Sequence, residues 1–463
     1  MIFSSVSFLF LFLPLFLISY LLLPWRNMVA LLFSLLFYSW GEGVYVVLLL
    51  ATVLINYLMG RAITSTDKRK LALSLGVGIN LTLLAYYKYF GFLINDVLML
   101  EGTELDTPHL PLGISFFIFQ SISYLVDVYR KDAKEAESFS DLALYISMFP
   151  QLIAGPIVRY SAVSEAITQR RITFSDTLAG MSLFVLGLSQ KMLIANNVAE
   201  VADHVYALDL TAVTTLTAWV GSTAYTLQIY FDFCGYSLMA MGIGRIMGFS
   251  FPRNFNYPYV SQSITEFWRR WHMSLSSWFR DYLYIPLGGN RKGPVRTYLN
   301  LFIVFFLCGL WHGASWTFVA WGIFHGMVLI IERAGLSFIL QKVPRIFSHS
   351  YTLILVIIGW VLFRAENFSQ VEHFLGVMFF PTVSMPAVTL SSLVGTENAV
   401  AMALGVVFSL PVLPWVLDKF TADRTVWSGA QLLTGGLVLL SMFLMCTTYI
   451  MAGTYNPFIY FRF

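Results

Sequence analysis

The sequence predicts an all-α protein that crosses a membrane many times. Of its 463 residues, 58% are hydrophobic and only 11% are charged, whereas soluble domains carry about 45–50% apolar and about 25% charged residues. So few charges cannot cover a core of this size in water, and lipid must therefore surround much of the surface. The apolar runs also lack the alternating pattern of a membrane barrel.

Apolar runs of spanning or near-spanning length follow one another along the chain. Since a helix needs about 20 apolar residues to cross the hydrocarbon core, we expect the shorter runs to be re-entrant, tilted or buried. We expect roughly eleven to thirteen helices in one polytopic domain, 1–463, without internal repeats. It would comprise N-terminal helices in 1–100, a catalytic core in 105–335 and C-terminal helices in 351–451. The runs lie at 3–23, 28–40, 43–60, 71–93, 110–129, 140–157, 176–196, 212–233, 235–250, 298–311, 314–332, 351–364, 398–416 and 430–451.

The first run, FSSVSFLFLFLPLFLISYLLL, is too long for a signal-peptide core. It has no basic segment before it and no small-residue cleavage site after it, so we expect a retained membrane helix.

Clusters of basic residues separate several of the runs. Short loops rich in Lys and Arg tend to face the cytoplasm, which makes these clusters the expected cytoplasmic loops. The largest cluster faces only two nearby acidic residues, Glu266 and Asp281. The clusters are Lys68, Arg69 and Lys70; Arg130, Lys131 and Lys134; Arg159, Arg170 and Arg171; and Arg269, Arg270, Arg280, Arg291, Lys292 and Arg296.

The largest cluster lies in the segment SITEFWRRWHMSLSSWFRDYLYIPLGGNRKG, residues 263–293. Its first four residues fit a capping box and predict a helix that begins at Ser263. On one continuous helix Glu266 would pair with Arg270, and His272 would share a face with Trp268, Arg269, Ser276 and Phe279. Such a helix is too polar to span the bilayer, so it would lie at the interface or dip into the protein. After Pro286, a Gly-Gly-Asn turn is expected.

Two interpretations of this segment stay open. Arginines over lipid headgroups and tryptophans in the interfacial belt would suit a membrane anchor. However, anchoring needs no histidine, and His272 beside two arginines favours a functional role.

A second histidine, His312, occurs in LCGLWHGASWTFVAWGIFHG, residues 307–326. Ionisable groups at membrane depth are rare and usually functional, and a neutral imidazole can accept a proton. Gly309 and Gly313 leave room for a substrate or for another backbone. The alternative is a histidine that only hydrogen-bonds a neighbouring helix. That explanation suffices for His325, which lies within a G-x-x-x-G pattern.

Other chemistries lack their sequence patterns. The histidines have no H-x-x-x-H spacing or cysteine partner for a metal, and the chain has no G-x-S-x-G elbow. Cys234, Cys308 and Cys446 lie in apolar surroundings and are expected to be buried without forming disulfides.

Several long motifs resemble the membrane-bound O-acyltransferase superfamily, and within it the bacterial alginate O-acetyltransferases. The motifs are MIFSSVSFLFLFLPLF at the start, PLGISFFIFQSISYLVDVYR at 111–130, FPQLIAGPIVRY at 149–160, YFDFCGYSLMAMGIG at 230–244, SQSITEFWRRWHMSLSSWFRDYLYIPLGGNR at 261–291, GLWHGASWTFVAWGIFHG at 309–326 and FIYFRF at the end.

The resemblance implies a multi-helix bowl with a central tunnel in the bacterial inner membrane. It implies an essential His312 in the W-H-G motif and a second histidine, His272, in the R-R-W-H motif. It also implies acetyl transfer from a cytoplasmic donor, acetyl-CoA, to periplasmic partner proteins that modify an exopolysaccharide. Neither a bound cofactor nor nucleic acid is expected.

From these residues we expect His312 to be the general base that activates an acceptor hydroxyl for attack on the donor thioester. His272 would position a substrate or stabilise developing charge. Cations suit the phosphates of coenzyme A, so we expect a donor-recruiting group on and after the turn and a second group near the reaction chamber. We expect Arg291, Lys292 and Arg296 to recruit the donor, and Arg269 and Arg270 to lie nearer the chamber and to be partly structural. All five are expected substrate-binding residues, together with Trp268 and Trp311.

The motif FDFCGYSL departs from the F-D-F-S-G-Y-S-D that is usual in the family. Cys234 replaces serine and Leu238 replaces aspartate. The change leaves cellulose or another exopolysaccharide open as the polymer. A different acyl donor, such as a D-alanyl carrier protein, or a lipid acceptor also stays open. A transporter would predict internal repeats and paired charges within the spans, and the sequence shows neither clearly.

Overall fold

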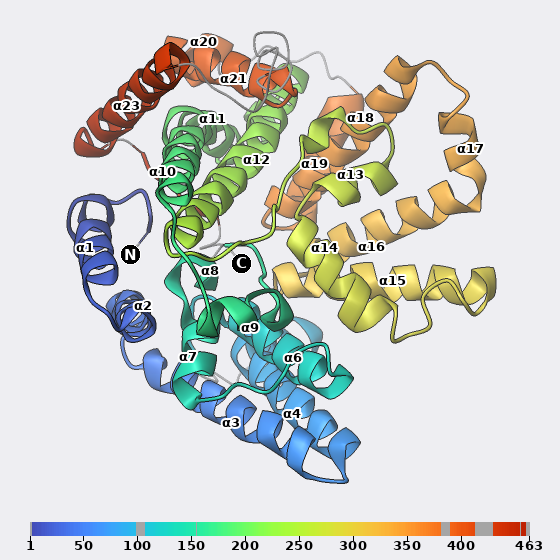
Figure 1. Cartoon of the computed structure of the whole chain (residues 1–463). Coiled ribbons are helices and arrows are strands. Elements are labelled where there is room, and N and C mark those ends of the chain that lie inside the picture. Colours follow the sequence, from blue (N-terminus) through green and yellow to red (C-terminus); the bar gives the residue numbers. More distant parts are fainter. Residues whose placement is uncertain are drawn as a thin grey trace. The chain divides into compact units, whose positions relative to one another are not determined.

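The computed structural model describes residues 2–98, 107–153, 155–380, 389–412, 429–453 and 455–459. Every regular element in these ranges is a helix (Figure 1). Seven stretches are long and apolar enough to cross a membrane, and Phe8–Leu22 and Thr396–Phe408 are shorter apolar helices. The prediction of an all-α polytopic membrane protein is therefore confirmed. The seven are Tyr45–Ser65, Arg69–Val97, Phe174–Tyr206, Gly293–His312, Trp316–Leu340, Arg345–Arg364 and Leu433–Met451.

Three of the predicted runs differ from the helices that form. The runs at 212–233 and 235–250 are a single helix, α12 (Thr215–Ile246). Gly235 lies inside this helix, where a Cβ would stand 2.6 Å from the Gly187 carbonyl, so glycine allows the close approach of the two backbones. The run at 140–157 instead divides into two short helices, since the backbone leaves the helical region at Met148, just before Pro150.

The described helices belong to two compact units, 1–184 with 236–253, and 185–235 with 254–463. Helices α10 (Phe174–Ser189) and α12 contribute to both. The first unit also contains α1 (Leu13–Leu22), α2 (Arg26–Glu42), α3 (Tyr45–Ser65), α4 (Arg69–Leu84), α5 (Phe90–Phe92), α6 (Ile114–Arg130), α7 (Phe139–Ser147), α8 (Phe149–Leu152) and α9 (Tyr160–Thr168).

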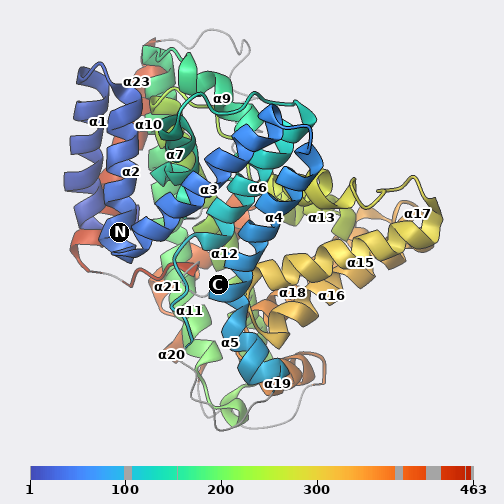
Figure 2. The same cartoon turned by 90° about the horizontal axis from the view of Figure 1, so that it is seen from below.

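In the first unit, α3, α4 and α6 pack against one another (Figure 2). Two buried asparagines join α3 to α4. The Asn56 amide donates to Asn80 Oδ1 at 3.1 Å, and the Asn80 amide donates back to Asn56 Oδ1 at 2.8 Å. Polar pairs of this kind hold helices together in lipid, where burial of apolar side chains gives little advantage.

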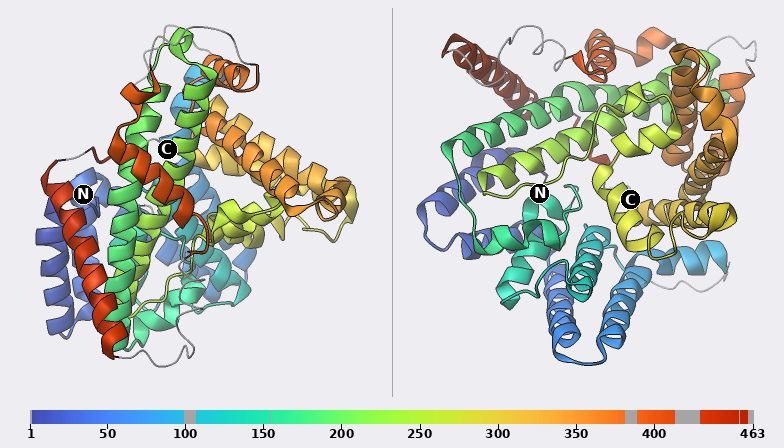
Figure 3. Two further views of the ribbon diagram at one scale, coloured as in Figure 1. Left: turned by 90° about the horizontal axis from the view of Figure 1, so that it is seen from above. Right: turned by 45° about the vertical axis from the view of Figure 1, so that its right-hand side comes forward.

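The second unit contains the whole polar segment 263–293 and the W-H-G motif. Its other helices are α11 (Asn196–Tyr206), α13 (Ile264–Arg270), α14 (Met273–Phe279), α15 (Gly293–His312), α16 (Trp316–Ile331), α17 (Ser337–Leu340), α18 (Arg345–Arg364), α19 (Phe368–Phe379), α20 (Leu390–Leu393), α21 (Thr396–Phe408) and α23 (Gly429–Met451). In Figure 3 the green helix α11 lies beside the first part of α12.

Helices α15 and α16 form a tight antiparallel hairpin in this unit (Figure 1). They touch through glycines: a Cβ on Gly309 would stand 2.4 Å from the Phe318 carbonyl, and one on Gly322 would stand 2.3 Å from the Phe305 carbonyl. Gly309 therefore admits another backbone, which is one of the two explanations that the sequence left open. Close packing of the hairpin fixes the position of His312 at its turn.

Candidate active site

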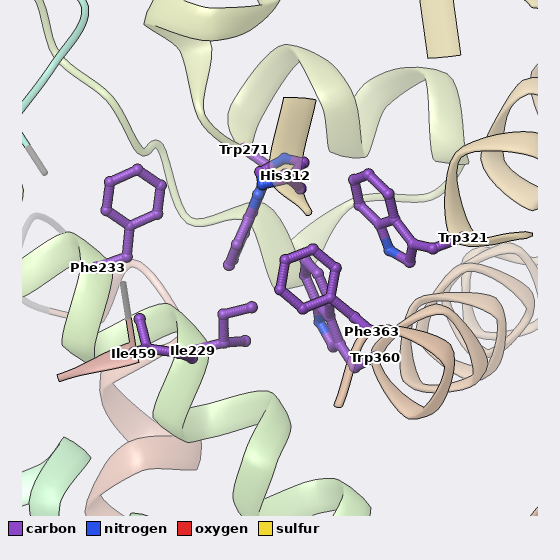
Figure 4. A pocket seen from close by; sticks show the side chains of 8 residues that line it. All are labelled: Ile229, Phe233, Trp271, His312, Trp321, Trp360, Phe363 and Ile459. Atoms are coloured by element: carbon purple, nitrogen blue, oxygen red, sulfur yellow. The ribbon is translucent and has the colours of Figure 1, made fainter. Parts of the chain in front are cut away.

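A narrow cavity in the second unit has His312 in its wall (Figure 4). Its volume of about 10 Å³ has room for roughly one water molecule. The other described side chains that surround it are aliphatic or aromatic, so among the described residues His312 is the one ionisable group in the lining. The lining residues are Ile229, Phe233, Trp271, His312, Trp321, Trp360, Phe363 and Ile459.

His312 is the last residue of α15 and is nearly buried, with 6% of its surface exposed. The chain turns at Gly313, whose N–H donates to the Gly309 carbonyl at 3.2 Å. Edge-on aromatic rings enclose the imidazole: Trp321 lies 5.0 Å and Phe363 5.2 Å from it, centroid to centroid. Packed on these sides, the ring has little freedom to turn, and its orientation toward the cavity is set before any substrate binds.

His272 lies at a break between α13 and α14, so the prediction of one continuous helix was wrong. Its backbone has φ of 42°, in the left-handed region. The break is fixed by Asn254, whose Oδ1 accepts from the Ser274 N–H at 3.2 Å and from the Ser274 hydroxyl at 2.9 Å. In addition, the Met273 N–H donates to the Asn254 carbonyl. These bonds cap α14 from outside the segment, and the helical face predicted around His272 does not form.

The same asparagine determines which nitrogen of His272 carries the proton. Its Oδ1 must be an oxygen, because a backbone N–H donates to it. His272 Nδ1, 3.1 Å from that oxygen, is therefore the protonated nitrogen. The lone pair is left on Nε2, which is buried and has no hydrogen-bond partner in the described part of the chain. Burial lowers the pKa of His272 to about 3, so the ring is neutral and its free nitrogen is an acceptor.

The two histidines are gathered around one tryptophan. Trp311 lies 5.0 Å from the His312 ring and 6.1 Å from the His272 ring, between centroids. Phe233, a lining residue of the cavity, packs edge-on against His272 at 4.6 Å. The structure thus brings His312, His272 and Trp311 together.

Two of the predicted substrate-binding residues make contacts within the protein. Trp268 is buried and donates through Nε1 to His325 Nδ1 at 3.4 Å. His325 in turn packs so closely on α18 that a Cβ on Gly359 would lie 2.7 Å from its Nε2, in agreement with the helix-packing interpretation. Arg270 pairs with Glu266 at 2.9 Å, as predicted, and donates to the Asn256 carbonyl at 3.1 Å.

The capping box that starts α13 is formed in part. The Ser263 hydroxyl accepts from the Glu266 N–H at 3.0 Å as expected, but the Glu266 carboxylate accepts from the Gln262 N–H. A further cap, Glu332, was not predicted. Its buried carboxylate accepts from the N–H groups of Ile264 and Thr265 at 2.6 and 2.9 Å. An ionisable side chain within an apolar run is the signal that could have identified it.

The remaining predicted cations differ in their exposure. Arg269, Arg291 and Lys292 are exposed, Arg296 is half-buried, and none has an ion pair with another described residue. The turn before α15 is anchored by the buried Asn300 side chain, which donates to the Gly289 carbonyl at 3.0 Å. Along α15, sixteen residues separate Arg296 from His312, which is about 24 Å at about 1.5 Å per residue.

A buried ion pair was missed because its two residues are far apart in the sequence. Lys191 and Asp232 lie 2.8 Å apart, each with a side chain only 2% exposed. Asp232 also accepts from the Ile459 N–H at 3.0 Å, and Lys191 donates to the Pro457 carbonyl. No paired charges within the spans were clear from the sequence, but Lys191 and Asp232 form such a pair. It holds the C-terminal segment 457–459, of which Ile459 lines the His312 cavity.

All three cysteines are buried without disulfide bonds, as predicted. Of the closing motif FIYFRF, Phe458 and Ile459 are described and 460–463 lie outside the described residues. Positions 413–416 of the run at 398–416 lie outside them as well.

Comparison with known proteins identifies the family of this chain. The model of the membrane-bound O-acyltransferase family, MBOAT, matches residues 6–369. A Pseudomonas putida protein named "Probable alginate O-acetylase AlgI" is 42% identical over 491 aligned positions that cover both chains completely. The Helicobacter pylori "Peptidoglycan O-acetyltransferase" is 36% identical, over 79% of this chain and 77% of its own length. The Bacillus subtilis "Teichoic acid D-alanyltransferase" is 30% identical over 48% of this chain and 60% of its own.

The matched region contains both His272 and His312, and a relative more than 30% identical matches the whole chain. The chain therefore belongs to the membrane-bound O-acyltransferase family and is a multi-pass membrane O-acyltransferase.

Proposed function

We propose that this protein takes acetyl groups from cytoplasmic acetyl-CoA and passes them across the bacterial inner membrane, where periplasmic partner proteins O-acetylate an exopolysaccharide such as alginate. The observation that carries the proposal is the cavity in which His312 is the one ionisable group among the described lining residues. Similarity to a named alginate O-acetylase over the full chain favours acetyl as the group and alginate as the polymer.

In the proposed reaction, His312 acts as the general base. Its neutral imidazole takes the proton of an acceptor hydroxyl while the hydroxyl oxygen attacks the thioester carbonyl. The C–S bond then breaks, the acetyl ester forms, and the coenzyme A thiolate takes the proton back from the imidazolium. The aromatic walls contribute by excluding water, which would otherwise hydrolyse the thioester.

Substrate entry requires the cavity to widen. Room for about one water molecule is too little for an acetyl thioester together with an acceptor oxygen. We therefore expect the described conformation to be the closed one.

His272 has a different role in this proposal. Because Nδ1 donates to Asn254, Nε2 can only accept a hydrogen bond. Such an atom cannot stabilise a developing oxyanion, which needs donors. It can hold an N–H or O–H of the substrate, so of the two roles considered from sequence, positioning is the one that the geometry favours.

Exposed cations would recruit the donor at a distance from the reaction. Arg291, Lys292 and Arg296 can bind the phosphates of coenzyme A as charge partners. Since about 24 Å of helix separates Arg296 from His312, these residues would contact a part of the donor remote from the reacting carbonyl. Their contribution is then to ground-state binding.

A second polymer stays a candidate because of the altered motif. Leu238 stands where relatives of this kind usually have aspartate. In addition, a relative that is 36% identical is named for peptidoglycan rather than alginate. Peptidoglycan, cellulose or another polymer is therefore the alternative acceptor for the same chemistry.

The test uses membranes that contain the protein, its periplasmic partners and one polymer at a time, with labelled acetyl-CoA. We expect base-labile acetate on alginate, and none with His312→Ala at normal membrane abundance. His204→Ala, which changes an exposed histidine, is the matched control and should behave as wild type. Normal acetylation by His312→Ala would refute the assignment of the base, and acetate only on another polymer would refute alginate.

A further inference from the structure

Acyl transfer in the His312 cavity requires a hydrogen-bond donor that neither His272 nor His312 supplies. When the acceptor oxygen attacks the thioester, negative charge develops on the carbonyl oxygen, and donors aimed at that oxygen lower the barrier. His272 Nε2 can only accept a hydrogen bond. His312 uses its lone pair to take the proton of the hydroxyl. The donor to the carbonyl oxygen must therefore be another group in the lining.

The indole N–H of Trp321 is a donor without an acceptor in the described part of the chain. Trp321 lines the His312 cavity, its side chain is fully buried, and its Nε1 has no hydrogen-bond partner there. An indole nitrogen can only donate, and a buried donor that is left unpaired destabilises a fold. Figure 4 shows this nitrogen on the side of the ring that faces Phe363, another lining residue. A substrate that brings an acceptor atom into the cavity would satisfy it.

The neighbours of Trp321 explain why its N–H stays unpaired. The His325 ring lies 5.0 Å away between centroids, but His325 Nδ1 already accepts from Trp268. Because a histidine that accepts at Nδ1 carries its proton on Nε2, neither nitrogen of His325 is left to accept from Trp321. The Phe363 ring, 5.1 Å away, has no oxygen or nitrogen to offer. These neighbours leave the indole N–H to a substrate.

The ring of Trp321 is held in place beside His312. The ring centroids of His312 and Trp268 lie 5.0 and 5.6 Å from its own, and Trp360 stacks on it at 6.3 Å. A donor held in this way needs no reorientation as charge develops. The cavity has room for about one water molecule. Since both residues line it, an oxygen atom that occupies it is adjacent to His312 and to Trp321.

We propose, on the basis of the acetyl transfer proposed above, that the Trp321 N–H donates to the thioester carbonyl oxygen and stabilises the oxyanion. The hydroxyl oxygen bonds to the carbonyl carbon while His312 takes its proton, and the π pair of the C=O bond moves to the oxygen that Trp321 holds. The pair returns as the C–S bond breaks, and the thiolate takes the proton from the imidazolium. The indole keeps its own proton throughout, so Trp321 is a catalytic residue that is neither base nor nucleophile.

The test removes the N–H and keeps the shape of the ring. Trp321 is replaced with benzothienylalanine, in which sulfur stands where indole has N–H. In membranes with the periplasmic partners, we expect kcat for coenzyme A release from acetyl-CoA to fall about 10²-fold, with KM changed less than about threefold. The matched control is the same replacement at Trp219, a half-buried residue of α12 whose Nε1 donates to the Met378 carbonyl at 3.0 Å. That control should keep the wild-type kcat.

A second measurement separates an oxyanion contact from a change of shape. Acetyl-dithio-CoA replaces the carbonyl oxygen of the donor with sulfur, which accepts hydrogen bonds only weakly. We expect wild type to prefer the oxygen donor, and the benzothienylalanine variant to lose about tenfold of that preference. Trp321→Phe, which also lacks the N–H but has a smaller ring, should show the same loss. A variant whose cavity is merely distorted would be slowed equally with both donors.

Two outcomes would overturn the role of Trp321 alone. A wild-type kcat in the benzothienylalanine variant would show that the N–H contributes nothing, and equal slowing with both donors would assign Trp321 a structural role. A third outcome, no coenzyme A release by wild type, would refute acetyl-CoA as the donor and remove this contact with it. Because benzothiophene fills nearly the same space as indole, the variant should reach the membrane at the wild-type level, which separates lost catalysis from lost fold.

Discussion

Removing one charge of the buried Lys191–Asp232 pair should destabilise the protein more than removing both. In Asp232→Leu, Lys191 would stay buried without a counter-charge, which costs about 3–5 kcal/mol. In the double variant Lys191→Met/Asp232→Leu no charge is left uncompensated. Its remaining cost is the unpaired Ile459 N–H and Pro457 carbonyl, about 1–3 kcal/mol for such a buried group.

The assay is a double-mutant cycle on the free energy of unfolding in detergent, with Lys191→Met as the other single variant. Arg245→Met is the matched control, since it removes the cation of an ion pair whose side chains are 48% and 34% exposed. We expect that control to cost at most about 1 kcal/mol. A single variant Asp232→Leu as stable as the double variant would refute the reasoning.

The same pair predicts a functional effect through the C-terminal segment. Asp232 and Lys191 bind the backbone at 457–459, and Ile459 is part of the cavity wall. The double variant should therefore recover stability relative to Asp232→Leu without recovering acetyl transfer, because both lack the anchor. Full activity of the double variant would show that the segment stays in place without the ion pair.

Three further predictions concern recruitment, the altered motif and pH. Replacing Arg291, Lys292 and Arg296 with alanine should raise the KM for acetyl-CoA more than it lowers kcat. The increase in KM should be smaller at high salt, where surface charges are screened. An unchanged KM in donor kinetics would contradict this prediction. Leu238→Asp should leave acetyl-CoA turnover intact if the position affects only the polymer, and loss of coenzyme A release would show otherwise. Burial lowers the pKa of His272 to about 3, whereas a histidine in an unfolded chain titrates near about 6.5. Between these two pH values the unfolded chain binds one more proton than the folded protein. The free energy of unfolding should therefore fall by about 1.4 kcal/mol for each pH unit by which the pH decreases. His272→Asn should remove that slope in unfolding measurements from pH 4.5 to 7.5, and an unchanged slope would mean that other groups cause it.

Features governed by local sequence were predictable. The apolar runs predicted the membrane helices, and the spacing of Glu266 and Arg270 predicted their ion pair because both lie within one helical turn or so. The G-x-x-x-G pattern likewise predicted the close packing around His325. Glu266 and Arg270 are neighbours on one helix, and both glycines of the G-x-x-x-G pattern also lie on one helix, α16.

Features that depend on distant residues were not predictable. The break at His272 is imposed by Asn254, eighteen positions earlier. Asn254 lies outside 263–279, so the helical pattern of that segment does not predict the break. Lys191 and Asp232 meet only because α10–α11 and α12 are antiparallel neighbours in the fold. Likewise, the sequence does not distinguish Arg269 from Arg270. In the structure Arg270 donates to the Asn256 carbonyl, whereas Arg269 is exposed.

The break at His272 also separates the tasks of the two histidines. A general base works best when its pKa is close to the working pH, and burial lowers the pKa of His272 to about 3. The ring would therefore hold an abstracted proton poorly at neutral pH, while the bond from Nδ1 to Asn254 keeps Nε2 aimed as an acceptor. Asn254→Leu should leave that ring free to turn and should raise KM more than it alters the pH dependence of kcat. A shift in the pH profile of kcat measured with this variant, with KM unchanged, would instead make His272 the base and remove that role from His312.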